Sequence, residues 1–203
     1  MSKDRRLVLV LLANLGMVVA LVVVGLVAKS LGVLAAGGDY LGDAAGTGLI
    51  LLALRISRDT HRYHRAPSYA ALANGSFLLL VTAAVIVEAL RRLIGGAPHV
   101  EGLPVIIVSV VAAVVMAACA LTIGTVETDD LNMRSVMLDT LADGASAVGV
   151  GVSGAAILLA HGVYWLDSAV ALGISAIIAY HAVRLIRDVV GALRGSGQRP
   201  PAT

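Results

Sequence analysis

Cysteine, aromatic residues and charge are all scarce in this chain of 203 residues. It has one cysteine, 3% aromatic residues, 14% charged residues and a formal net charge of +2. A single cysteine excludes a disulfide framework and a zinc-finger cluster. The small net charge argues against a nucleic-acid partner. The shortage of aromatic side chains argues against a binding cavity for organic cations, because such cavities are built from aromatic rings.

Apolar residues are what the chain has in excess. Hydrophobic residues make up 59% of it, and the mean hydropathy is +0.93. A soluble protein of this length could not bury so much apolar surface. Several apolar stretches are also longer than the roughly 18 residues that mark a membrane-spanning helix. The composition therefore predicts an all-α integral membrane protein.

Short polar breaks divide the apolar sequence into six predicted transmembrane helices. The first is too long for the apolar core of a signal peptide, so we expect it to remain in the mature protein. Residues 1–190 then form one transmembrane domain, and residues 191–203, which are rich in Gly and Pro, form a short flexible tail. The helices are expected at residues 7–28, 31–55, 68–92, 102–124, 133–159 and 163–187.

The basic residues predict how this six-helix bundle lies in the membrane. If the N-terminus is cytoplasmic, the outer ends of the helices hold only Lys29, Arg91 and Arg92 of the 15 Lys and Arg residues. Basic residues accumulate on the cytoplasmic side, so both termini are predicted to face the cytoplasm from a cell (inner) membrane. Near the outer end, Glu88 is expected to pair with the two arginines, and Asp167 to cap the sixth helix.

Two pairs of aspartates lie mid-way along predicted membrane helices. Asp39 and Asp43 occur in GGDYLGDAAG, and Asp139 and Asp143 occur in MLDTLADGAS. Carboxylates at i and i+4 share one helix face, and carboxylates at this depth are costly unless they have a function. The alternative is a purely structural role, in which the aspartates are protonated and form hydrogen bonds between helices. Two similar pairs on oppositely directed helices instead favour a four-carboxylate site for a small divalent cation.

Three stretches of the sequence resemble a known family. They are DLNMRSVMLDTLADGASAVGV around the fifth helix, HRYHRAPSYAALANG leading to Asn74 on the third, and YWLDSAVALGISAII at the start of the sixth. In these stretches the chain resembles the cation diffusion facilitator family of divalent metal/proton antiporters. The resemblance implies a compact bundle with the metal on the second and fifth helices. It further implies a transporter rather than an enzyme, with no catalytic residues, no cofactor and a homodimer formed through membrane helices.

The chain departs from that family pattern in two ways. Asp139 stands where zinc-transporting members usually have His, so the expected metal ligands Asp39, Asp43, Asp139 and Asp143 are all carboxylates. Carboxylates suit Mn²⁺ better than imidazole does, so we expect Mn²⁺ or Zn²⁺, with Co²⁺, Fe²⁺ and Cd²⁺ also open. The sequence also ends soon after the sixth helix. We therefore expect a short member of the family without the C-terminal cytoplasmic domain.

The chemistry of close carboxylates predicts the mechanism. Four of them in a low-dielectric bundle cannot all stay ionised without a cation, so a metal must displace protons to bind. Exchange on alternate sides of the membrane would give proton/metal antiport and metal export. One alternative is a proton-coupled exporter of small organic cations. A remote one is an intramembrane aspartyl protease, although Asp39-Tyr40 reverses the Tyr-Asp order that such enzymes use.

Overall fold

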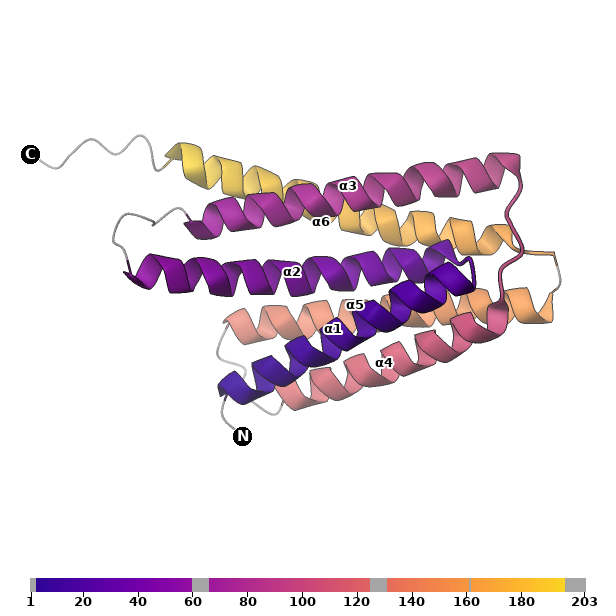
Figure 1. Cartoon of the computed structure of the whole chain (residues 1–203), viewed down its shortest axis with the longest axis horizontal. Helices are drawn as coiled ribbons and strands as arrows, with labels where there is room; N and C mark the ends of the chain where they lie inside the picture. Colours follow the sequence, from indigo (N-terminus) through magenta and orange to yellow (C-terminus); the bar gives the residue numbers. More distant parts are fainter. Residues whose placement is uncertain (1–2, 60–65, 125–130, 161, 196–203) are drawn as a thin grey trace, which may run out of the picture.

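The computed structural model describes residues 3–59, 66–124, 131–160 and 162–195. Within these ranges the chain forms six long helices and no strand, which confirms the predicted all-α class (Figure 1). The sixth helix extends beyond the predicted end at residue 187, and residues 196–203 of the predicted tail lie outside the described part. The helices are α1 (Lys3–Val27), α2 (Leu31–Asp59), α3 (Ala66–Gly95), α4 (Gly102–Gly124), α5 (Leu131–Leu159) and α6 (Trp165–Gly195).

The outer surface of the helices is suited to lipid. Large apolar side chains point outward, among them Leu80 of α3, which is 71% exposed, and Val114 of α4. Four stretches with described side chains are long and apolar enough to cross a bilayer, and α1 adds a shorter apolar stretch. The chain is therefore a multi-pass membrane protein. The four stretches are Ser68–Gly95, Gly102–Leu121, Leu141–Leu159 and Trp165–Arg194.

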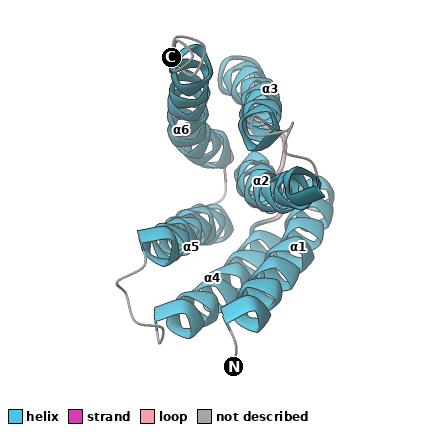
Figure 2. Ribbon diagram, turned by 90° about the vertical axis from the view of Figure 1, so that its left-hand side faces the viewer, coloured by secondary structure: helices cyan, strands magenta, loops and turns pink. Residues whose placement is uncertain are grey.

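Helix α2 occupies the middle of the bundle. It packs against α1, α3, α5 and α6. Helices α3 and α6 lie together on one side of it, whereas α4 and α5 lie together on the other (Figures 1 and 2). Helix α1 begins and α6 ends at the same end of the bundle, on the left in Figure 1. This central position brings α2 into contact with most of the other helices, including α5, which holds the second acidic pair.

Glycines allow α4 and α5 to pack closely. A Cβ atom added at Gly102 would lie 2.6 Å from the carbonyl oxygen of Gly154, which is closer than real Cβ contacts. A Cβ atom at Gly154 would similarly lie 2.8 Å from a methyl group of Val105. Small residues let membrane helices approach each other backbone to backbone. Residues 102 and 154 therefore must be small for this helix pair to form as it does.

The turn between α1 and α2 is short and closed by backbone hydrogen bonds. Lys29 adopts a left-handed conformation with φ of 57°. Its N–H donates to Leu26 O at 3.4 Å, and Ser30 N–H donates to Gly25 O at 3.0 Å, the pattern of a Schellman motif. Ser30 then caps the next helix, because its Oγ accepts a 3.1 Å hydrogen bond from the N–H of Val33. Thus α2 begins at a defined residue and in a defined direction.

Candidate functional site

The first acidic pair lies on α2, and both of its side chains are half-buried. Asp39 and Asp43 are one helical turn apart on the same face. On the same side of α2, two glycines approach α3 closely. A Cβ at Gly42 would clash with the side chain of Leu78, and one at Gly46 would lie 2.7 Å from Asn74 Nδ2. Close packing with α3 therefore fixes the rotation of α2 about its own axis.

The second acidic pair lies on α5. Asp143 is buried, with 5% of its surface exposed. The next residue, Gly144, faces α4, since a Cβ there would lie 3.6 Å from Met116 Cβ. Both α2 and α5 have 29 residues, and Asp43 and Asp143 each lie just before the middle of their helix. The structure thus places acidic groups on the central turns of two helices that pack against each other.

Tyr40 lies close to acidic residues of both helices. Its side chain, which is on α2, is completely buried near Asp143 of α5 and near Asp39 and Asp43 of its own helix. Among the described residues, its hydroxyl group has no hydrogen-bond partner. We did not predict a role for Tyr40 from the sequence. The available signal was its position three residues before Asp43, which places it on the neighbouring surface of the same helix.

The four-carboxylate site is only partly described. Asp139 lies on α5, one turn before Asp143, and its side chain falls outside the described part of the chain. Within that part, no three His, Cys, Asp or Glu side chains are grouped so that they could hold a metal ion. Helices α2 and α5 are in contact, as expected from the acidic pairs. The ligand set itself stays a prediction.

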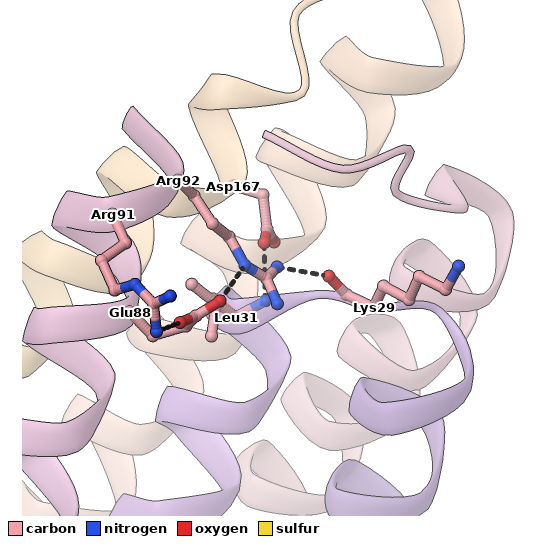
Figure 3. Close-up of polar contacts among 6 residues, drawn as sticks. All are labelled: Lys29, Leu31, Glu88, Arg91, Arg92 and Asp167. Atoms are coloured by element: carbon pink, nitrogen blue, oxygen red, sulfur yellow. Dashed lines mark hydrogen bonds and ion pairs between the residues drawn. The ribbon is translucent and has the colours of Figure 1, made fainter. Parts of the chain in front are cut away.

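Asp167 caps a different helix from the one we predicted. It lies in the first turn of α6, and we expected it to cap α6 itself. Its carboxylate instead accepts hydrogen bonds from the start of α2, and Figure 3 shows the one from Leu31. Oδ2 accepts from Leu31 N–H at 2.6 Å, and Oδ1 accepts from Gly32 N–H at 3.2 Å and from Ser30 Oγ at 2.5 Å. No sequence pattern distinguishes this arrangement from an ordinary cap, because the two segments are far apart in the chain.

Arg92 of α3 reaches the same turn. Its Nη1 donates a 2.8 Å hydrogen bond to the carbonyl oxygen of Lys29, and its Nε lies 3.1 Å from Glu88 Oε1 (Figure 3). Arg91 also pairs with Glu88, at 3.6 Å. The predicted pairing of Glu88 with both arginines is confirmed. Helices α3 and α6 therefore both bind the turn that starts α2.

The fold and the acidic helices define a multi-pass helical membrane protein with carboxylates at its centre. A family model described as the cation efflux transmembrane domain matches residues 7–193. The chain belongs to this cation efflux family, which confirms the resemblance to cation diffusion facilitators.

Several curated relatives match most of this chain. It is 29% identical over 200 residues to the zinc transporter ZitB of Pectobacterium atrosepticum, a match that covers 95% of the chain and 62% of the relative. It is 27% identical to the metal cation efflux system protein CzcD of Cupriavidus metallidurans, covering 84% of the chain and 55% of the relative. A cadmium, cobalt and zinc/H(+)-K(+) antiporter of Bacillus velezensis is 23% identical over 83% of the chain and 56% of its own length. The chain thus spans about 62% of the ZitB relative and less of the other two.

Proposed function

We propose that this protein exports a divalent transition-metal cation from the cytoplasm across the cell (inner) membrane in exchange for protons. The observation that supports this most directly is the contact between α2 and α5, each with an acidic residue on its central turns. Membership of the cation efflux family supports metal as the substrate. The relatives named above are described as transporters of zinc, cadmium and cobalt or of metal cations, and one is named as an antiporter.

The proposed ion site consists of Asp39 and Asp43 from α2 with Asp139 and Asp143 from α5. Two carboxylates at i and i+4 on each helix supply oxygens from both sides of the contact. Tyr40 is completely buried close to three of these carboxylates. A divalent cation would compensate the negative charge that these carboxylates otherwise concentrate there.

Proton exchange follows from the same carboxylates. Without a cation, close carboxylates in a poorly solvated bundle share protons rather than remain fully ionised. A metal ion binds only as those protons leave, so binding and proton release are coupled. If the site opens alternately to the two sides of the membrane, an inward proton gradient drives the metal outward. In this proposal the aspartates act both as ligands and as proton carriers.

The ligand chemistry favours Mn²⁺ or Zn²⁺ as the ion. An all-oxygen set suits Mn²⁺, which prefers carboxylates to imidazole. Four oxygens in a tetrahedral arrangement also accommodate Zn²⁺. Measuring the transport of each ion by the reconstituted protein distinguishes them, because the coordination and the dehydration of the ion both contribute to the transport rate.

The test is metal-dependent proton flux in proteoliposomes that contain a pH-sensitive dye. Mn²⁺, Zn²⁺, Co²⁺, Cd²⁺ and Mg²⁺ are added in turn, and flux is expected with one or two of the transition metals. Asp43→Asn and Asp143→Asn should each abolish this flux, because an amide neither carries a proton nor compensates a cation's charge.

Asp188→Asn is the matched control, since Asp188 is an exposed residue of α6. It should transport like wild type. Undiminished flux in both site variants would defeat the proposed site. Flux with lipophilic organic cations, in the absence of any response to metals, would instead support the organic-cation exporter.

A further inference from the structure

The backbone N–H groups at the start of α2, from Ser30 to Val33, all have hydrogen-bond partners. A helix leaves the N–H groups of its first turn without partners inside the helix. Here Ser30 N–H donates to Gly25 O, and Val33 N–H donates to Ser30 Oγ. The N–H groups between them, of Leu31 and Gly32, both donate to the Asp167 carboxylate. Local residues therefore supply two of the partners, and α6 supplies the partner for the other two.

The carbonyl groups at the end of α1 are bound as well. Ala28 O accepts a 3.2 Å hydrogen bond from Glu101 N–H, in the connection between α3 and α4. Lys29 O accepts the hydrogen bond from Arg92. The α1–α2 turn is thus attached to α3, to the α3–α4 connection and to α6. Asp167 and Ser30 are both completely buried there, so these polar groups have no access to solvent.

Gly32, the second residue of α2, faces Val150 of α5 at close range. A Cβ atom at Gly32 would lie 3.1 Å from Asp167 Oδ1 and 3.6 Å from the methyl groups of Val150 on α5. Val150 is itself buried. The cap on α2 therefore lies directly beside the contact between α2 and α5.

Gly32 and Val150 lie at the same distance along their helices from Asp39 and Asp143, respectively. Asp39 is seven residues after Gly32 on α2, and Asp143 is seven residues before Val150 on α5. Seven residues are about two helical turns, or roughly 10 Å, and bring the chain back to the same helix face. The two helices run in opposite directions, so both steps lead from the contact toward the centre of the bundle. The contact at Gly32 thus aligns the helix faces that present Asp39 and Asp143.

From this geometry we propose that Asp167 is a positioning residue for metal transport. By holding the N-terminus of α2 beside Val150, it sets the spacing and register at which Asp39 faces Asp143. Asp167 is not itself a ligand, because its oxygens are engaged by the start of α2, about two turns from Asp39. This inference rests on the proposed metal site between α2 and α5.

The test uses Co²⁺ as the probe of the reconstituted full-length protein. Co²⁺ uptake gives KM and kcat, and the visible d–d absorption of bound Co²⁺ reports its coordination geometry. Asp167→Asn keeps the shape of the side chain but places an amide NH₂ against the N–H groups of α2. Loss of a group that orients metal ligands typically weakens metal affinity about 10- to 100-fold. We therefore expect KM to rise by a similar factor. The Co²⁺ absorption spectrum, normalised to the amount of folded protein, should also change.

Two further variants make the outcome interpretable. Gly32→Ala leaves Asp167 unchanged but inserts a methyl group between its carboxylate and Val150, so it should raise KM in the same direction by a smaller factor. Glu101→Gln removes an exposed carboxylate at the same end of the bundle, and its KM should match that of wild type. If Asp167→Asn does not fold, Gly32→Ala decides the question.

A purely structural cap would behave differently. It would lower thermal stability and the yield of folded protein, but would leave KM and the Co²⁺ spectrum of the folded fraction unchanged. That result in Asp167→Asn, or in Gly32→Ala if the first does not fold, would overturn the positioning role alone. If wild type neither binds nor transports Co²⁺ or any other metal tested, the proposed function fails as well.

Discussion

The backbone N–H of Leu31 donates a 2.6 Å hydrogen bond to the carboxylate of Asp167, although 136 positions separate the two residues in the chain. Helix caps are usually supplied by the residue that precedes the helix. Here the local cap, Ser30, accepts from the N–H of Val33, and Asp167 of α6 accepts from the two preceding N–H groups, those of Leu31 and Gly32. The start of α2 is consequently defined by tertiary structure as much as by its own sequence.

We predict that Ser30→Ala destabilises the protein. The variant loses the bond to Val33 N–H and the bond to Asp167, both buried, and capping residues contribute about 0.5 to 2 kcal/mol. Thermal unfolding of the purified protein in detergent should show a lower Tm. Ser76→Ala, which changes an exposed serine on α3, should leave Tm unaltered. Equal Tm values for both variants would contradict the importance of this cap.

We predict that Gly102→Ala disrupts the packing of α4 on α5, whereas Gly149→Ala does not. A methyl group at residue 102 would meet a backbone carbonyl at 2.6 Å, and a backbone atom cannot rotate away as a flexible side chain can. Overpacking of this kind costs about 1 to 3 kcal/mol. Nothing lies within 4 Å of a Cβ at Gly149. Thermal unfolding of both variants, compared with wild type, measures the difference.

We predict that Asp139→His shifts metal preference toward zinc. Imidazole is a better ligand for Zn²⁺ than for Mn²⁺, whereas carboxylate suits Mn²⁺. The ratio of kcat/KM for Zn²⁺ to that for Mn²⁺ should rise about tenfold, which corresponds to about 1.4 kcal/mol. Proton-flux measurements with each metal give this ratio. An unchanged ratio, in a variant that still transports, would show that residue 139 does not contact the ion.

Much of the helical architecture can be predicted from the sequence because membrane helices have a strong local signal. Long apolar stretches must satisfy their backbone hydrogen bonds internally, so they become helices whatever surrounds them. The acidic pairs were visible for the same reason, since Asp43 and Asp143 interrupt apolar stretches. The contributions of Tyr40 and Asp167 were not predictable, because each depends on which helices are neighbours. Asp167 was assigned to its own helix on local grounds, and the fold directs it to α2.

That this protein is a helical membrane protein with two acidic pairs on separate spans follows from its amino-acid sequence alone. Those properties depend on composition and on spacing within a single helix, which act before any helix meets another. The arrangement of the helices follows from the fold: α2 has α3 and α6 on one side and α5 on the other, and Gly32 of α2 lies close to Val150 of α5. The choice of neighbours depends on close packing at glycines and on buried hydrogen bonds between distant residues, and neither is determined by one segment alone.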